Sequence, residues 1–208
     1  MQQAHKRVSN DDYMTKAEKI KALQAEGLTP DEIDFELGRD EFLAAYPDAP
    51  VSEDIECLNL IMRKEFAMQI LSGEKKVEVR AYSQFYYNRL FDKNVMAWGD
   101  AKAEEMTKEG VDEGIVNAFV TDCVDYLNPL RQVKKIHFHN YDNTWYLDVE
   151  CTANYQLAVV RDQVEQLQML YDCHEFDEML VDLEKQKAKD RPLYFYFVVG
   201  EILGTNLR

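Results

Sequence analysis

The run GEKKVEVR, from Gly73 to Arg80, holds the side chains whose types and spacing best suit chemistry. A lysine held near a glutamate and partly removed from water has a tunable pKa, which suits it to proton transfer or nucleophilic attack. An arginine can hold a carboxylate or a phosphate through two parallel hydrogen bonds. The run thus predicts a reactive pair, Lys75 and Glu78, beside an anion-binding group, Arg80. The simplest alternative is a row of solvated ion pairs on the edge of a sheet.

The elements on either side of the run decide where its charges point. Residues 58–61 (LNLI) predict a short buried strand, and residues 63–72 predict a helix that Gly73 ends in a left-handed conformation. The expected apolar face of this helix is Phe66, Ala67, Ile70 and Leu71. Strict strand alternation from Glu74 would place Lys75 on the face of Val77 and Val79, where a lysine needs a partner. We therefore expect a strand that begins after Lys75 or is bulged there, with Lys75 approaching Glu78 and Arg80.

The rest of the chain predicts two helical regions around a β-rich body. Residues 11–46 predict two helices, the second opened by a capping box at Thr29 and Glu32 with Pro30 in its first turn. Residues 28–46 also resemble a helix-turn-helix with a recognition segment at 39–46, although two acids to one base suit a DNA groove poorly. The proline-rich segment 46–54 predicts a boundary, and residues 83–131 are expected to be mostly helical.

The last part of the chain predicts a hairpin, helices and a closing strand. The hairpin covers residues 133–151 with a turn at Asp142-Asn143, residues 161–186 form one or two helices, and residues 193–199 form a central strand that Gly200 and Gly204 break or bend. Apolar stripes are expected on two of the helical segments, at Ile115, Val116, Phe119, Val120, Cys123, Val124 and Leu127, and at Val164, Leu167, Leu170, Met179, Leu180 and Leu183.

The segment from Leu58 to Arg80 closely resembles the opening of the ASCH domain (activating signal cointegrator homology), which shows a strand, a helix and then the motif G-x-K-x-x-E-x-R. Gly73, Lys75, Glu78 and Arg80 occupy its fixed positions, and residues 195–203 are similar to the last barrel strand of that family. The resemblance implies an α+β fold: a small PUA-like β-barrel over residues 51–208, with an N-terminal helical extension at 1–50 and a helical insertion near 95–131. The motif is then expected to line a cleft between barrel and helix.

What the resemblance implies about function is RNA or nucleotide binding, with ligand contacts from Gly73, Lys76, Arg80 and Tyr82. Some small bacterial members are similar to amidohydrolases that act on N4-acetylcytidine, in which the motif lysine, a threonine three residues later and a distant glutamate are catalytic. Here the middle residue is Glu78, which excludes a threonine nucleophile at that position, and Glu175 or Glu178 is the candidate for the distant glutamate. The implied alternative is therefore an enzyme with Lys75, Glu78 and Glu175 as its catalytic group.

Charge and composition limit these readings. The net charge of −15 argues against general nucleic-acid binding, and it favours a third possibility, an acidic scaffold for protein partners. However, residues 51–98 hold 7 basic and 7 acidic side chains, so a local cationic site is compatible with an acidic chain. The four cysteines form no C-x-x-C pair and are expected to be reduced and mostly buried.

The remaining candidate sites are weaker. His137 and His139 share a strand face without a third ligand at metal-binding spacing, so neither a metal nor a cofactor is expected. The adjacent Cys173 and His174 do not suit a nucleophile–base pair, and Tyr82, Tyr86 and Tyr87 are expected to pack on the barrel unless they stack on a base. Neither an apolar run of membrane-spanning length nor a signal peptide is evident, which predicts a cytoplasmic location.

Overall fold

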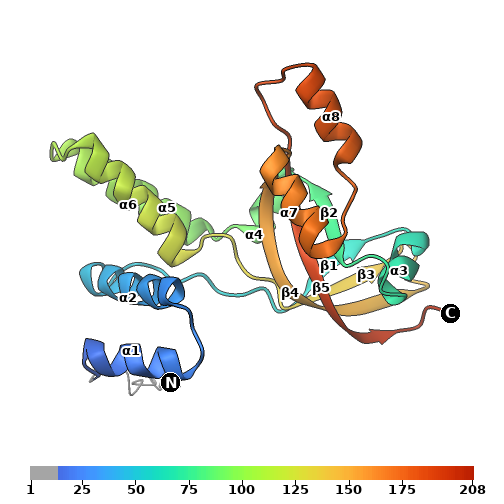
Figure 1. Cartoon of the computed structure of the whole chain (residues 1–208), viewed down its shortest axis with the longest axis horizontal. Coiled ribbons are helices and arrows are strands. Elements are labelled where there is room, and N and C mark those ends of the chain that lie inside the picture. The colour runs from blue at the N-terminus through green and yellow to red at the C-terminus, as the bar shows by residue number, and fades with distance from the viewer. Residues whose placement is uncertain (1–13) are drawn as a thin grey trace. The chain divides into compact units, whose positions relative to one another are not determined.

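The computed structural model describes residues 14–208, and it shows an α+β chain, as predicted (Figure 1). Residues 11–13 of the expected N-terminal helices, and residues 1–13 of the expected extension, lie outside the described residues. The helices are α1 Lys16–Ala25, α2 Pro30–Ala45, α3 Lys64–Leu71, α4 Gln84–Leu90, α5 Lys93–Lys108, α6 Glu113–Leu127, α7 Arg161–Tyr171 and α8 Asp177–Lys185. The strands are β1 Leu58–Ile61, β2 Val77–Ala81, β3 Lys135–His139, β4 Tyr146–Ala158 and β5 Leu193–Thr205.

The chain separates into two compact units. Unit 1 comprises the residues up to Pro50 together with Lys102–Leu127, and unit 2 comprises Val51–Ala101 and Asn128–Arg208. The boundary at Pro50 falls within the proline-rich segment, and a second boundary lies inside α5. The helical segment at 102–127 therefore groups with the N-terminal helices rather than with the sheet.

Unit 1 is built on aromatic contacts between α2 and α6. The Phe42 ring lies 6.0 Å from Phe119 and 5.6 Å from Tyr126, and the Arg39 Nε donates to the carbonyl oxygen of Tyr126 (3.1 Å). The capping box at Thr29 and Glu32 is confirmed. Because α2 is one unbroken helix from Pro30 to Ala45, the separate recognition segment of a helix-turn-helix is absent, and that reading is wrong.

The two predicted apolar stripes are only partly correct. On α6 the i, i+4, i+8 set Phe119, Cys123 and Leu127 is buried, whereas Ile115, Val120 and Val124 are exposed. On α7, Val164 and Leu167 are buried but Leu170 is exposed. A stripe that spans more than one helical face cannot be buried by a single neighbour, so only its central residues are covered.

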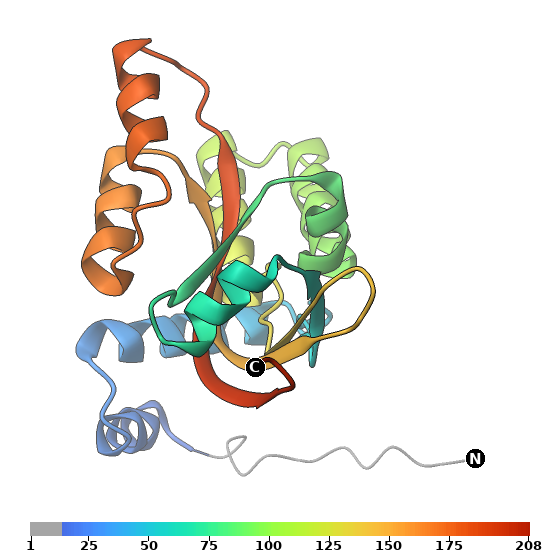
Figure 2. The same ribbon diagram turned by 90° about the vertical axis from the view of Figure 1, so that its right-hand side faces the viewer.

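Unit 2 is a curled five-stranded sheet with the strand order β1-β3-β4-β5-β2 (Figures 1 and 2). β1 and β3 are parallel and the other neighbours are antiparallel, so β1 and β2 are the two edges of the sheet. The hairpin prediction is confirmed by the pairing of β3 with β4, and β5 is an inner strand, as expected.

The curl comes from bulges where β4 crosses β5. The register shifts between Asp148 and Ala153, opposite the region of Gly200. A Cβ at Gly200 would lie 2.5 Å from the Glu150 Oε2 and 2.7 Å from the Thr152 Cγ2, so a larger residue here would force the side chains of Glu150 and Thr152 to shift. β5 continues without interruption to Thr205. Of the two outcomes predicted for Gly200 and Gly204, a break or a bend in the strand, the break is therefore excluded.

Two apolar cores flank the sheet. The concave face encloses the larger one, formed mainly by side chains from β1, β3, β4 and β5 with α3, including Leu60, Phe138, Leu147, Phe195 and Phe197. The second core lies where α7, α8 and the segment between them pack on the outer face, and its residues are Leu157, Val159, Val164, Leu167, Cys173, Phe176 and Leu180. None of the helices in residues 14–208 has the length and apolar character that crossing a bilayer requires.

The four thiols provide a test of this packing. Burial raises the pKa of Cys123 to about 11 and that of Cys151 to about 12, and it also raises the pKa of Cys173, whereas Cys57 is exposed. Because the thiolate is the reactive form, we expect Ellman's reagent at pH 8 to modify one thiol rapidly in the native protein and four in denaturant. Cys57→Ser should abolish the rapid phase. Any thiol that still reacts rapidly in that variant would contradict the fold.

Candidate functional site

The charged run lies at the open seam between the two edge strands. β2 begins at Val77, after Lys75, which confirms the first of the two arrangements expected from the sequence. Glu78 and Arg80 pair with Phe197 and Phe195 of β5, whose side chains lie in the main core. Residues opposite one another in an antiparallel pair share a face, so Glu78 and Arg80 project toward the concave side of the sheet.

The other face of β2 is apolar. Val77 pairs with Val198 and Val79 with Tyr196, and Val79 and Tyr196 both pack against the second core beneath α7 and α8. The Glu78 side chain therefore lies on the core side of β2, while Val77 and Val79 pack on the opposite side and fix the position of the strand. This packing explains how a carboxylate comes to be buried, with only 6% of Glu78 exposed.

Lys75 is positioned by the end of α3. Gly73 has φ +79°, the left-handed conformation that ends the helix, as predicted. The backbone N–H of Lys75 then donates to the carbonyl oxygen of Gln69 (3.0 Å), which fixes the chain as it turns toward β2. The Lys75 Nζ lies 5.7 Å from the centre of the Phe66 ring, within the range of a cation–π contact.

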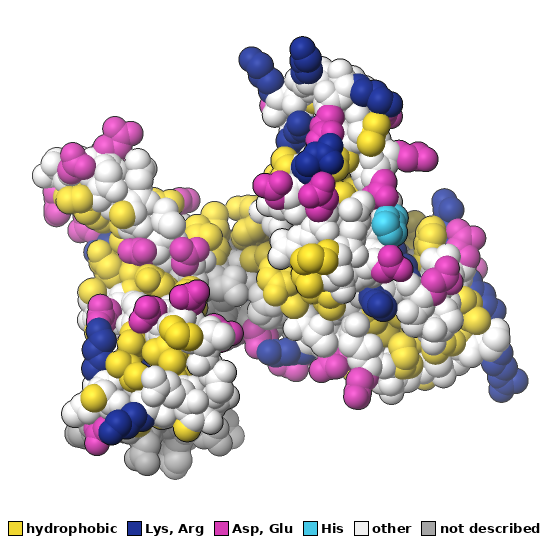
Figure 3. All heavy atoms as spheres, viewed as in Figure 1, with side chains coloured by type: hydrophobic (Ala, Val, Ile, Leu, Met, Phe, Trp, Pro, Cys, Tyr) yellow, Lys and Arg dark blue, Asp and Glu magenta, His cyan; other side chains and the backbone are white. Residues whose placement is uncertain are grey.

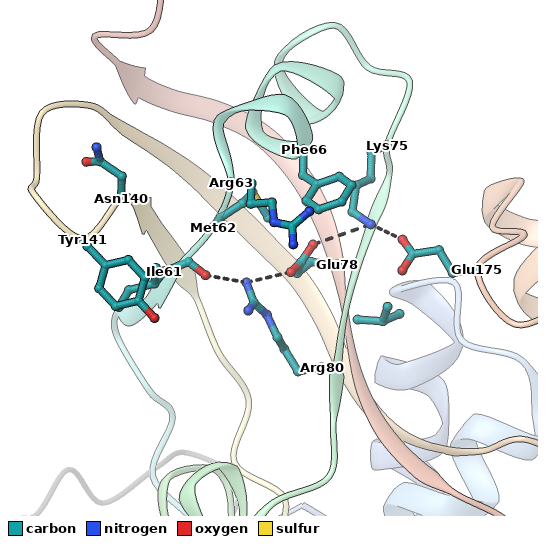
Figure 4. Close-up of a pocket in the computed structure, with 11 residues that line it drawn as sticks. Ile61, Met62, Arg63, Phe66, Lys75, Glu78, Arg80, Asn140, Tyr141 and Glu175 are labelled. Carbon is teal, nitrogen blue, oxygen red and sulfur yellow. Dashed lines mark hydrogen bonds and ion pairs between the residues drawn. The ribbon is translucent and has the colours of Figure 1, made fainter.

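These side chains form a continuous ion-pair network, shown in Figure 4. The Lys75 Nζ lies 3.6 Å from the Glu78 Oε2 and also pairs with Glu175, which comes from the segment between α7 and α8. The Arg80 Nη2 lies 2.8 Å from the Glu78 Oε1 and donates to the carbonyl oxygen of Ile61 (3.0 Å), the last residue of β1. The network thus runs from α7–α8, through β2, to the opposite edge of the sheet.

Burial governs the protonation of Glu78. Loss of water raises the pKa of its carboxyl above the ordinary value, while the charges of Arg80 and Lys75 oppose that rise. Glu175 is nearly half exposed and lies on the outer side of Lys75. The site therefore contains two carboxyl groups of different environments on either side of one lysine.

A pocket of about 540 Å³, here called the seam pocket, opens beside this network. It is a suitable size for a small ligand. Its lining residues are Ile61, Met62, Arg63, Phe66, Lys75, Glu78, Val79, Arg80, Asn140, Tyr141 and Glu175. The pocket thus combines cationic, carboxyl and aromatic side chains.

The structure brings together most, but not all, of the predicted site residues. Lys75, Glu78, Arg80 and Glu175 line the seam pocket, and it is Glu175 rather than Glu178 that reaches Lys75. Lys76 lines a neighbouring pocket with Lys75 and Glu175. Gly73 acts through the backbone turn at the end of α3, and the Tyr82 ring stacks 5.6 Å from Phe195 without lining the seam pocket.

Sequence reasoning missed seven of the eleven lining residues, among them Arg63, Phe66 and Tyr141. Phe66 was expected on the buried face of α3, but it is 38% exposed and borders the pocket, while Ala67 and Ile70 are buried. Arg63 precedes α3, and Tyr141 lies in the turn of the β3–β4 hairpin, 83% exposed. An aromatic residue beside the polar hairpin turn Asp142-Asn143 is the signal that could have identified Tyr141, and the sequence-based prediction did not use it.

The weaker candidates have structural roles. The Nδ1 of His137 contacts Asp148 and that of His139 contacts the carbonyl oxygen of Asn140. Hydrogen bonds with Asp177 and Asp172 raise the pKa of His174, and burial raises the pKa of the Cys173 thiol. No cluster of three metal-binding side chains occurs in residues 14–208.

A comparison with family models, curated proteins and solved structures finds no significant match for this chain.

Arg80→Ala tests the network directly. The substitution leaves Glu78 buried with only Lys75 nearby, so the free energy of unfolding near pH 7 should fall by about 2–4 kcal/mol. It should also raise the pKa of Glu78 further. A raised carboxyl pKa costs no stability below its unfolded value and costs progressively more as pH rises through the folded value, so the loss should be smaller at pH 5 than at pH 8. Urea unfolding at both pH values measures this difference.

Two further variants serve as controls. Arg161→Ala removes an exposed arginine with its own ion pairs and should leave the free energy of unfolding nearly unchanged at both pH values. Adding Glu78→Gln to Arg80→Ala should remove most of the pH dependence. An Arg80→Ala penalty that is equal at pH 5 and pH 8 would show that Glu78 does not depend on Arg80.

Proposed function

We propose that this chain is a binding module of the ASCH, PUA-like type that holds single-stranded RNA or a nucleotide in the seam pocket. The observation that carries the proposal is the convergence of Lys75, Glu78 and Arg80, the charged positions of the motif, on one pocket with two aromatic rings. The order of β1, α3, motif and β2, and the curled sheet, are what the resemblance implies, and they support the family assignment as part of this proposal.

The pocket offers the chemistry that a nucleotide requires. Phe66 and Tyr141 present partly exposed rings on which a base can stack. Arg63, Lys75 and Arg80 supply donors for phosphate oxygens, of which Arg63 is the most exposed. Glu78 orients Lys75 and Arg80 from beneath, so their donors are in place before a ligand binds.

The acidic surface of the chain limits the phosphate contacts that a nucleic acid can make outside the pocket. Asp and Glu side chains appear on both units in the view of Figure 3, in keeping with the net charge of −15. Binding therefore depends on contacts inside the pocket rather than on a broad positive surface. We expect moderate affinity that weakens as salt increases, in proportion to the few phosphates contacted.

Lys75→Ala provides the test of binding. Removing one charge-assisted contact should weaken binding of a fluorescein-labelled single-stranded RNA decamer by about tenfold, measured by fluorescence anisotropy. Lys185→Ala, which removes an exposed lysine from α8, is the matched control and should leave the affinity unchanged.

The contradicting outcomes are distinct. Equal affinity of wild type, Lys75→Ala and the Arg80 variant would remove the seam pocket as the site. An absence of RNA and nucleotide binding by the wild type at low salt would favour the acidic protein-interaction scaffold instead.

A second function, amidohydrolysis of an acylated nucleoside such as N4-acetylcytidine, is favoured by the pairing of Lys75 with Glu175. In this mechanism Glu175 removes a proton from water, the oxygen attacks the amide carbonyl, and the Lys75 ammonium stabilises the oxyanion. Glu175, which then carries the water proton, returns it to the departing amine, and Glu78 holds the Lys75 ammonium in position. The C–N bond breaks to give acetate and the free amine.

Acetate release from N4-acetylcytidine distinguishes the two functions. An enzyme should release acetate, and Glu175→Gln should lower kcat by at least about 100-fold because the general base is lost. Asp162→Asn, a matched change on α7 away from the pocket, should have no effect. Wild-type protein that binds the nucleoside without releasing acetate would restrict the site to binding.

A further inference from the structure

A second pocket adjoins the seam pocket on the far side of Arg80. It has a volume of about 410 Å³ and is here called the arginine pocket. Its main lining side chains are Arg80, Phe85, Tyr86, Arg89, His139 and Tyr141. Ile61, Arg80 and Tyr141 line both pockets, so the bridge from Arg80 to the Ile61 carbonyl lies at their common boundary.

The arginine pocket has an unusual charge for this chain. None of the described residues that line it is an Asp or a Glu, although the chain as a whole carries a net charge of −15. The Arg89 guanidinium lies 4.1 Å from the centre of the Phe85 ring, and Arg89 makes no ion pair with a carboxylate of residues 14–208. An anion entering this pocket therefore meets the Arg89 guanidinium and the Arg80 guanidinium, whose carboxylate partner Glu78 lines the seam pocket instead.

The pocket on the opposite side of the seam pocket has the reverse character. It shares Phe66, Lys75 and Glu175 with the seam pocket, and its other charged lining residues are Lys76, Glu74 and Asp172. His174 within it is already paired with Asp172 and Asp177. Three carboxylates against two lysines make this pocket less favourable to a phosphate than the arginine pocket, so the electrostatics favour extension of a ligand toward the arginine pocket.

The rings of the arginine pocket suit a second base. Phe85 is 53% exposed, and Arg89 stacked on it forms a flat cationic surface of the kind on which bases stack. Tyr141, at the boundary, is exposed to both pockets. The two pockets, of about 540 and 410 Å³, share Arg80 at their boundary, as successive nucleotides of a strand share a phosphate.

We propose that the two pockets bind neighbouring nucleotides of one strand, with the linking phosphate at Arg80, so that the ligand is single-stranded RNA of at least two nucleotides rather than a free mononucleotide. This inference rests on the proposed binding function and specifies its ligand class. Phe85 and Arg89 are its specificity-determining residues, and neither belongs to the G-x-K-x-x-E-x-R run.

The test compares two probes on the same variants. The first is a fluorescein-labelled RNA decamer of random sequence, followed by anisotropy, and the second is each of the four nucleoside 5′-monophosphates, followed by NMR chemical shifts. Wild type should bind the decamer at least about tenfold more tightly than any monophosphate. Phe85→Ala and Arg89→Ala should each weaken decamer binding by about tenfold and leave monophosphate binding unchanged.

A salt titration adds a readout that a purely structural role would not move. Arg89→Ala should reduce the slope of log K against log salt concentration by about 0.7, the value for one phosphate contact on a single strand. Arg161→Ala and Met169→Ala, which remove an exposed arginine and an exposed apolar side chain from α7, are the matched controls and should leave both affinity and slope unchanged.

The outcomes separate this inference from the function on which it rests. Decamer binding that depends on Lys75 but not on Phe85 or Arg89 would overturn the two-pocket inference and leave the proposed function in place. Equal affinity for the decamer and a monophosphate would also overturn it. Absence of binding to either probe would remove both proposals together.

Discussion

The Arg80 guanidinium spans the two edges of the curled sheet, and much of unit 2 is arranged around it. One nitrogen pairs with Glu78 on β2 and donates to the Ile61 carbonyl at the end of β1, although these strands are not hydrogen-bonded neighbours. A sheet that curls without closing leaves unpaired backbone groups on both edges. Arg80 satisfies one of those carbonyls and keeps the seam at a fixed width. The ligand-sized space beside it exists because the seam is bridged by a side chain rather than sealed by a strand ladder.

The position of Arg80 also explains why the Glu78 carboxylate depends on its two cations and how the ion-pair network extends to Glu175. Glu78 projects into the concave side of the sheet and is desolvated, so its carboxylate depends on the two cations it contacts. Lys75 extends the network to Glu175 and thereby links β2 to the segment between α7 and α8. A ligand that draws Arg80 or Lys75 away from these carboxylates must replace their interactions, so an anionic ligand is favoured over a neutral one.

The sequence predicted the local elements well because their signals are local. The capping box at Thr29, the left-handed Gly73 and the alternation in β4 each depend on residues within a few positions of one another. The conflict between Lys75 and the valine face predicted either a strand that starts after Lys75 or a bulge, and the strand starts after Lys75. By contrast, the grouping of residues 102–127 with the N-terminal helices depends on long-range contacts between aromatic side chains, and no periodicity within α6 could reveal its partner.

The site was predictable only in part, because some of its residues come together through long-range contacts that sequence spacing does not show. The charges of the motif are close in sequence, but Tyr141 and the Ile61 carbonyl reach the pocket through the curl of the sheet. Phe66 and Leu170 show that an apolar residue at the edge of a helical stripe can be exposed when the neighbouring element covers only the centre. Phe85 and Arg89 lie on a short helix whose relation to Arg80 becomes visible only in three dimensions.

The central claim is that the seam bridged by Arg80 is the ligand-binding surface of this protein. Backbone amide NMR of the full chain, titrated with an unlabelled single-stranded RNA decamer, tests it most directly. The account predicts that chemical shift changes concentrate on residues 61–66, 75–80, 85–89 and 139–141, and that unit 1 and α8 are unaffected. Changes confined to unit 1 or to α8, with the seam residues unmoved at saturation, would contradict it.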